Sequence, residues 1–266
     1  MFWNYTKKRT GMDYLKLFLV CRLIVWFSVL LIFPQFCNAG SLLIEGGAGR
    51  VEINGVDVDK IESININSST NSGCVEGSGV RSTHKREIDY FNQIDISGVF
   101  DVNIECQKEQ YVEVTSDDNI LPYVVTKVKS RTLFVTVNKS ICPKSGLELN
   151  VSVNNMEKVS VDGASDLVIT RVDNQELVMD LDGSGDIVAS GKTVEFVASI
   201  AGAIDLDAKN LTSEKVRIPV AGASDSSIYA SKKLHADISG VGDIYYYGNP
   251  EEIIENISGV GELIKE

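Results

Sequence analysis

The sequence predicts an all-β protein, a parallel β-helix or solenoid with a repeat of about 19 residues. Three observations predict it: one short phrase recurs six times in the second half of the chain, its copies are almost evenly spaced, and apolar residues alternate beside each copy. The repeat is too short for a helical hairpin or a propeller blade. It suits one coil of parallel strands stacked about 4.8 Å apart.

The phrase reads aliphatic, any, glycine, small, any, acidic, usually aliphatic. Its copies are VDGASDL (161–167), LDGSGDI (181–187), IAGAIDL (200–206), VAGASDS (220–226), ISGVGDI (238–244) and ISGVGEL (257–263). Their glycines are Gly163, Gly183, Gly202, Gly222, Gly240 and Gly259, a nearly even spacing along the chain. We place the regular repeats at 157–266. An earlier copy, ISGVFDV at 96–102, indicates that the leading part uses the same unit with longer insertions.

Alternation with a period of two, as in Leu177, Met179 and Leu181, predicts strands with one buried face. Within each coil, we expect the aliphatic residue before glycine to point inward and the glycine to form a corner. We expect the small residue after the glycine to fit the interior. Those small residues are Ala164, Ser184, Ala203, Ala223, Val241 and Val260.

The acidic position of the phrase predicts a column of carboxylates along one edge of the coils. Its members are Asp166, Asp186, Asp205, Asp225, Asp243 and Glu262. We favour a role in the turn, in which each carboxylate accepts backbone amide hydrogen bonds at its own corner. Calcium bridging neighbouring carboxylates is the alternative, although the phrase supplies no second acidic column.

The charge of the chain argues against two classes of partner. With 37 acidic and 25 basic residues, the formal net charge is -12. This charge disfavours non-specific attraction to nucleic acid or to an anionic membrane surface. We therefore expect no nucleic-acid partner.

Residues 1–39 have the order of a signal peptide: basic residues, an apolar run over 23–33, Pro34 and a small-residue site ending at Ala39. We expect cleavage after Ala39, which would leave a net charge of about -16. An uncleaved signal anchor, a lipoprotein modified at Cys37 and a start at Met12 remain as alternatives. Residues 40–76 are predicted to form extra strands and a linker.

Three cysteines follow the predicted leader, so one intrachain disulfide can form. We favour Cys106 with Cys142, since both lie at or just beyond the ends of strand-like runs. Three separate thiols, including Cys74, are the alternative.

The sequence carries no constellation of catalytic, cofactor-binding or metal-ligating residues. His84 and His235 are the two histidines, and neither has acidic or cysteine neighbours at the spacing of metal ligands. His235 is expected on the outer side of a strand. We therefore predict no catalytic residue, cofactor or metal ligand.

Three consecutive tyrosines, Tyr245 to Tyr247, follow the fifth copy of the phrase. On a strand, Tyr245 and Tyr247 share one face and Tyr246 takes the other. The outer face is either a contact surface or a cover for the open end of the solenoid. Pro250, Glu251, Glu252, Lys265 and Glu266 are expected to protect that end. They lie around the last copy of the phrase.

Residues 77–266 resemble the head GIN domain family of autotransporter adhesins. The resemblance lies in GSGV at Gly77, FNQIDISGVFDVNI at 91–104, VEVTSDDNILPYV at 112–124, TLFVTV at 132–137 and the GASDL, GSGDI and GVGDI repeats. It implies a right-handed, β-helix-like exported domain that serves surface adhesion or envelope interaction, with no established activity.

We therefore expect an exported, non-enzymatic solenoid that acts as an adhesin or contacts the cell envelope. A structural envelope scaffold is one alternative. A glycan-active enzyme is another alternative, because β-helices can carry glycan-cleaving acidic residues that no sequence motif marks. The expected partner is a cell-surface protein or glycan, and the expected location is the periplasm, the outer cell envelope or the medium. Membrane contact is expected only through an uncleaved N-terminal signal.

Overall fold

The computed structural model describes residues 52–53, 56–57 and 73–266. The chain divides into two compact units, residues 1–68 and 69–266. In the first unit, β1 (Glu52–Ile53) pairs antiparallel with β2 (Val56–Asp57). The predicted leader and its cleavage site lie outside the described residues. Within the described ranges, no helix is both long enough and apolar enough to span a membrane.

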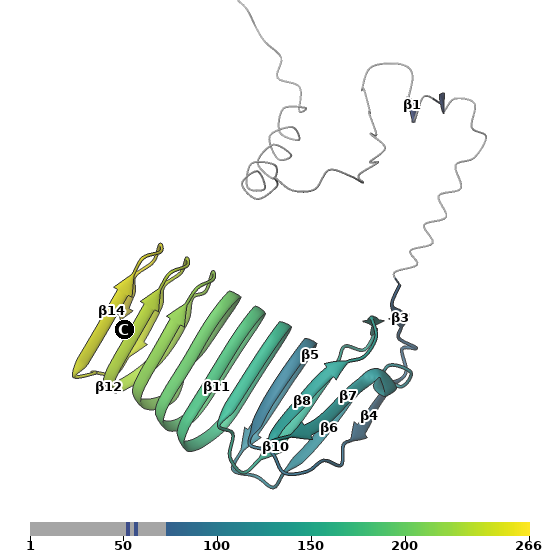
Figure 1. Ribbon diagram of the computed structural model, residues 1–266, viewed down its shortest axis with the longest axis horizontal. Coiled ribbons are helices and arrows are strands. Elements are labelled where there is room, and N and C mark those ends of the chain that lie inside the picture. The colour runs from purple at the N-terminus through teal and green to yellow at the C-terminus, as the bar shows by residue number, and fades with distance from the viewer. Residues whose placement is uncertain (1–51, 54–55, 58–72) are drawn as a thin grey trace, which may run out of the picture. The chain divides into compact units, whose positions relative to one another are not determined.

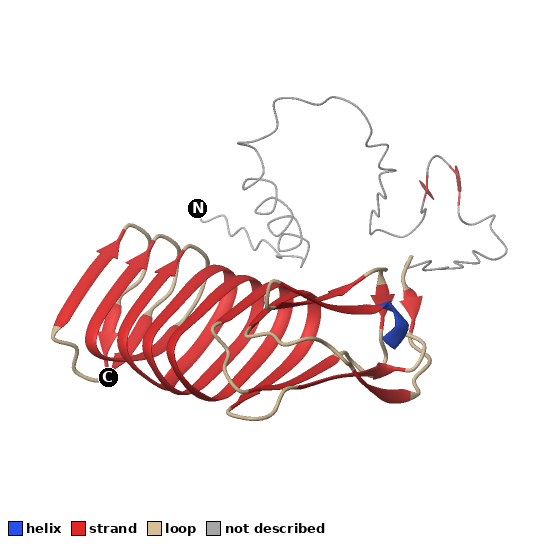
Figure 2. Ribbon diagram, turned by 60° about the horizontal axis from the view of Figure 1, so that its bottom comes forward, coloured by secondary structure: helices blue, strands red, loops and turns tan. Residues whose placement is uncertain are grey.

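Residues 73–266 of the second unit form strands, connecting loops and one short 3-10 helix, η2 (Leu121–Tyr123), which confirms the all-β class (Figure 2). The strands are β3 (Val75–Glu76), β4 (Arg81–Lys85), β5 (Gln93–Cys106), β6 (Tyr111–Asp117), β7 (Val124–Lys129), β8 (Thr132–Val137), β9 (Ile141–Cys142), β10 (Glu148–Val153), β11 (Lys158–Val220), β12 (Ser226–Ile238), β13 (Ile244–Tyr247), β14 (Glu252–Ile257) and β15 (Leu263–Lys265).

Successive copies of the phrase lie side by side in parallel register (Figure 1). Gly163 of β11 pairs with Gly98 of β5, and Val220 of β11 pairs with Ile238 of β12. Ile238 pairs in turn with Ile257 of β14. The early copy at 96–102 therefore forms part of the same stack as the regular copies. We call the chain from one phrase to the next a coil.

The strands before the regular copies differ from the wholly parallel arrangement expected from the sequence. β10 pairs in parallel with β5 but antiparallel with β6, and β4 pairs antiparallel with β6. β7 and β8 form an antiparallel hairpin whose turn residues, Ser130 and Arg131, both have positive φ. A two-residue turn can join only antiparallel neighbours, so local turn chemistry decides the direction of β8 relative to β7.

The coils enclose one continuous apolar core. The aliphatic residue before each phrase glycine is buried in the inner coils, as expected from the alternation. Those residues are Ile96, Val161, Leu181, Ile200, Val220 and Ile238.

The expectation for the small residue after the glycine is wrong. Ala164, Ser184, Ala203, Ala223, Val241 and Val260 are all exposed. The next residue turns inward instead, and Phe100, Ser165, Ile204 and Ser224 are buried there. The buried hydroxyl of Ser165 has a hydrogen-bond partner within the protein, because Ser165 Oγ accepts from the Phe100 amide at 3.2 Å. The inward and outward alternation continues through the glycine, so the next inward side chain belongs to the second residue after the glycine.

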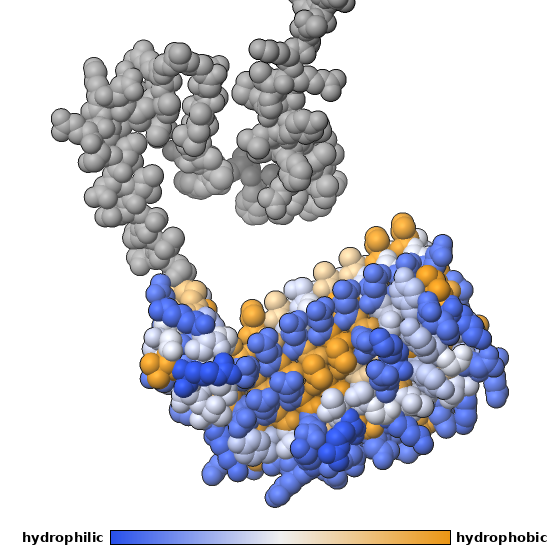
Figure 3. Space-filling model, turned by 180° about the vertical axis from the view of Figure 1, so that it is seen from behind, coloured by the Kyte–Doolittle hydropathy of each residue, from blue (hydrophilic) through white to orange (hydrophobic). Residues whose placement is uncertain are grey.

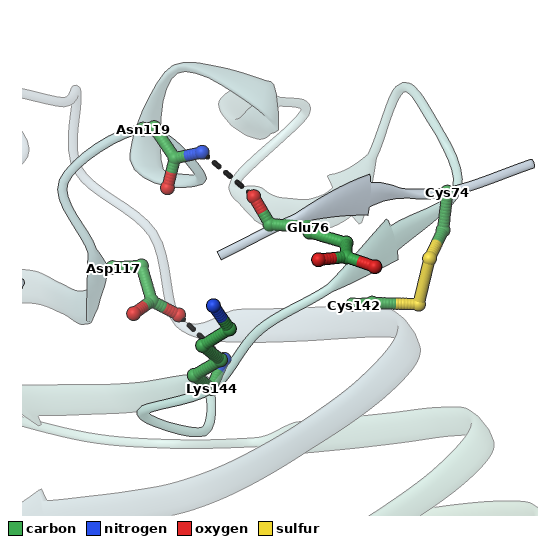
Figure 4. Close-up of a disulfide and its surroundings, with 6 residues drawn as sticks. All are labelled: Cys74, Glu76, Asp117, Asn119, Cys142 and Lys144. Atoms are coloured by element: carbon green, nitrogen blue, oxygen red, sulfur yellow. Dashed lines mark hydrogen bonds between the residues drawn. A yellow bond between two sulfur atoms is a disulfide. The ribbon is translucent and has the colours of Figure 1, made fainter. Parts of the chain in front are cut away.

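The predicted disulfide is also wrong. Cys74 forms the bridge with Cys142 (Figure 4), and Cys106 is a free, buried thiol. Cys106 lies in an inward position of β5, whereas Cys142 lies on the exposed strand β9, which pairs with β3 directly after Cys74. Strand pairing, which the run lengths do not reveal, brings the two bonded cysteines together.

The last coil ends the stack with charged residues in core columns. Glu255 pairs in register with the buried Ala236, and Lys265 pairs with the buried Tyr246. On the same coil, Ile253 and Ile257 are 44% and 38% exposed. Glu255 thus stands at this end together with the residues named from the sequence, and the protection of the end stays a prediction. Inward-pointing charges are a common defence of a sheet edge against pairing with another chain.

Candidate functional site

The predicted arrangement of the three consecutive tyrosines is confirmed. Tyr246 is 9% exposed and belongs to the core, whereas Tyr245 and Tyr247 lie on the outer side of β13. Tyr247 pairs in register with Tyr229 of β12, which also faces outward. We name Tyr229, Tyr245 and Tyr247 the tyrosine patch.

Sequence reasoning missed Tyr229. The signal was present, because Tyr229 stands at the same offset from Gly222 as Tyr247 does from Gly240. Equal offsets from the phrase glycine place side chains in the same outer column, so a column-by-column alignment of the repeats would have revealed it.

Charged groups surround the tyrosine patch. Lys209 forms an ion pair with Asp207 at 2.8 Å. The pKa of Lys209 is raised, first by its hydrogen bond to Asp207 and then by the negative charge of Asp207. Tyr247 makes a smaller contribution in the same direction. The pKa of Tyr245 is raised, chiefly by the negative charge of Asp243. Its hydroxyl therefore stays protonated near neutral pH and is available as a hydrogen-bond donor.

An apolar band adjoins hydrophilic bands on one face of the second unit (Figure 3). Val168 and Val188 are exposed, and each stands at the same offset from its phrase glycine as Tyr245. The same outer column therefore contains two valines, then Asp207 and Ser227, and then Tyr245 near the C-terminal end. Such a surface offers both apolar and hydrogen-bonding contacts.

The acidic column is held by bonds between coils. The amide nitrogens of Asp186, Asp225, Asp243 and Glu262 donate to the carboxylates of Asp166, Asp205, Asp225 and Asp243, respectively, at 2.9 to 3.3 Å. The amide partners expected from the sequence are present, but they lie on the next coil and not at the carboxylate's own corner. Within the described part of the chain, no three acidic, histidine or cysteine side chains gather in a way that could hold a metal ion.

His235 lies in a polar cluster on the outer side of the last coils. Asp237 Oδ1 is 3.1 Å from His235 Nε2 and accepts a 2.8 Å hydrogen bond from Asn256. The pKa of Asp237 is lowered first by this bond from Asn256 and then by His235 and Arg217. The other histidine, His84, lies on β4, and several strands separate β4 from β12 in the sheet order. The two histidines therefore belong to different surfaces.

A buried carboxylate that the sequence did not reveal joins the loops near the disulfide (Figure 4). Asp117 accepts hydrogen bonds from the amides of Gly79 and Lys144 at 2.7 Å, and from the amide and hydroxyl of Ser145 at 3.1 and 2.8 Å. Burial acts to raise the pKa of Asp117, but these hydrogen bonds outweigh it and lower the pKa below the ordinary value. Asp117 therefore stays charged and ties two loops together.

The chain was compared with protein families, curated proteins and solved structures. Residues 90–250 match the family described as "Putative auto-transporter adhesin, head GIN domain". A solved structure of a putative adhesin from Bacteroides fragilis has 20% sequence identity and a TM-score of 0.57, and the match covers 72% of this chain and 100% of that one. A putative adhesin from Parabacteroides merdae has 23% identity and a TM-score of 0.47 over 72% of this chain and 99% of that chain. No curated protein matches the chain.

Proposed function

We propose that this chain, which belongs to the head GIN domain family of auto-transporter adhesins, is an exported, non-enzymatic adhesin. Its coils form a right-handed β-solenoid with a repeat of about 19 residues. The parallel registers of β5, β11, β12 and β14 support the solenoid. The strong preference of parallel crossovers for the right hand supports its handedness.

The tyrosine patch is the contact surface of the adhesin. The grouping of its three tyrosines on the outer side of the strands is the observation that carries the proposal. Three tyrosines lie on the outer side of adjacent coils, where packing of the core does not require an aromatic ring. Tyrosine supplies a large, rigid contact area and a hydroxyl at little entropic cost, which makes it a favoured contact residue in interfaces. The partner is a cell-surface protein or a glycan.

The adhesin acts in the periplasm, in the outer cell envelope or outside the cell. The basic and apolar order of residues 1–39 supports export. The bond between Cys74 and Cys142 is compatible with it, since disulfides persist in oxidising compartments.

Adhesion of the chain from residue 40 onward, which contains the whole second unit, tests the proposal. Saturable binding of the labelled protein to intact cells is expected. Replacing Tyr229, Tyr245 and Tyr247 together with serine should weaken it about tenfold or more, in line with the loss of clustered contact residues. Tyr90→Ser is the control, because Tyr90 is a tyrosine that is 58% exposed and lies outside the patch.

Two results would count against this function. Unchanged cell binding by the triple serine variant would reject the tyrosine patch as the contact surface. Absence of saturable binding, together with cross-linking of the protein to envelope proteins, would favour the structural scaffold instead.

A further inference from the structure

A polar pocket lies away from the tyrosine patch, between the end of β10 and the corner of the next coil. Its volume is about 660 Å³, and five carboxamide and three carboxylate side chains line it. Asn154 and Asn155 come from the link between β10 and β11, and Asn174 and Gln175 come from the corner of the following coil. Gln107, just after β5, adds a third segment. We name it the amide pocket.

The three segments form a connected frame. The Gln107 amide donates to the Asn154 carbonyl, and the Gln107 side chain donates to the Asp173 carbonyl, both at 3.2 Å. Asn174 Nδ2 donates to the Met156 carbonyl at 2.7 Å. These bonds fix the Gln107 and Asn174 side chains and the backbone around them, so part of the site is formed before a ligand binds.

One polar atom in this frame is unsatisfied. Asn174 Oδ1 is buried and has no hydrogen-bond partner among the described residues. Leaving a buried acceptor without a partner is unfavourable. This oxygen has almost no surface accessible to solvent, so a ligand hydroxyl or amine could donate to it only after the Asn174 side chain turned toward the pocket.

We propose that the amide pocket binds a sugar without negative charge, either neutral or amino-substituted, at the end of a glycan. Carboxamides both donate and accept, which suits the adjacent hydroxyl groups of a pyranose, and carboxylates add acceptors for hydroxyl or ammonium hydrogens. The lining contains no lysine, arginine or histidine, so a uronate, sialate or sulfated sugar would meet uncompensated like charge. The volume falls within the range typical of small-molecule sites.

A cation fits the amide pocket less well. Calcium requires oxygen ligands at about 2.3–2.6 Å around one point. No group of three acidic side chains in the described ranges converges in this way. The carboxylates Glu157, Asp173 and Glu176 are therefore assigned to hydrogen bonding with the sugar.

The inference is tested by titrating the chain from residue 40 onward with lactose, chitotriose, its N-acetylated form and sialyllactose, using calorimetry and saturation-transfer NMR. At least one uncharged or amino sugar should bind, and sialyllactose should bind more weakly than that sugar. Asn154→Ala with Gln175→Ala should weaken binding about tenfold or more. Asn138→Ala, which changes an amide outside the pocket, should leave it unchanged.

Failure of all the non-anionic sugars to bind would overturn the inference. Binding of sialyllactose as tight as that of the best non-anionic sugar, full binding by the double variant, or loss of binding in EDTA would also overturn it. The biological use of the pocket rests on the proposed adhesion. The two ideas fail separately, because cell binding that depends on the tyrosine patch can persist without sugar binding, and the reverse also holds.

Discussion

Asp117 illustrates how a single residue can organise loops that are distant in sequence. Its carboxylate accepts hydrogen bonds from Gly79 on one side and from Lys144 and Ser145 on the other. Cys74 and Cys142 join the same two regions covalently. Buried carboxylates are stable only when such donors compensate for lost hydration. Asp117 is therefore expected to contribute to stability in a pH-dependent way.

The sign of that dependence follows from the lowered pKa of Asp117. The unfolded value is about 3.9. The stabilisation is fully present above that value and is lost as the pH falls through the lower, folded-state pKa. Urea unfolding measured from pH 6 to pH 2 should show this acid loss, and Asp117→Asn should reduce its pH dependence while lowering stability at pH 6. Asp89→Asn, which changes an exposed carboxylate, is the control. If the Asp117→Asn variant lost the same amount of stability between pH 6 and pH 2 as the unchanged protein, this role would be contradicted.

Between coils, the decisive element is the column of phrase glycines. A Cβ built on Gly183 would collide with the backbone carbonyl of Gly163, and a Cβ on Gly202 would collide with that of Gly183. Gly183 also has a φ of 133°, which side-chain-bearing residues rarely adopt. Neighbouring coils can approach closely at this corner only because the column carries no side chains.

Gly183→Ala is expected to destabilise the second unit by at least about 2 kcal/mol, since it adds both backbone strain and a backbone clash. Chemical denaturation monitored by circular dichroism would measure the change. Ser184→Ala alters the adjacent, exposed residue and should change stability by less than about 0.5 kcal/mol. Similar stabilities for the two variants would show that the corner can relax without cost.

At the scale of the whole second unit, the stack of coils needs an end that does not recruit another chain. Glu255 and Lys265 occupy columns that are apolar on the preceding coil. Lys265 Nζ donates to Asn249 Oδ1 at 3.0 Å, which holds its charged group near the end of the stack. Burying either charge under a second molecule would be costly, so these residues oppose end-to-end association.

Replacing both charges, with Glu255→Ala and Lys265→Leu, should produce association that increases with protein concentration. The exposed Ile253 and Ile257 would then extend into a continuous apolar end. Sedimentation velocity over a concentration series would detect it. Glu252→Ala removes a charge that pairs with Lys233 on β12 and should leave the protein in its original state. An unchanged sedimentation coefficient in the double variant would mean that other features protect this end.

The sequence by itself determined the strand class, the positions of the repeated phrase and the inward or outward side of Tyr245, Tyr246 and Tyr247. Alternation is a local property with a period of two, so it can be read without knowing which strands pair.

Only the tertiary structure decided which distant segments meet. It selected Cys74 over Cys106 as the partner of Cys142, joined the loops at Asp117 and brought Asn154 and Asn174 into one pocket. It also placed the amide partners of the acidic column on neighbouring coils. These contacts depend on strand register and on loops that cross between strands, and neither is encoded in the spacing of residues along a single strand.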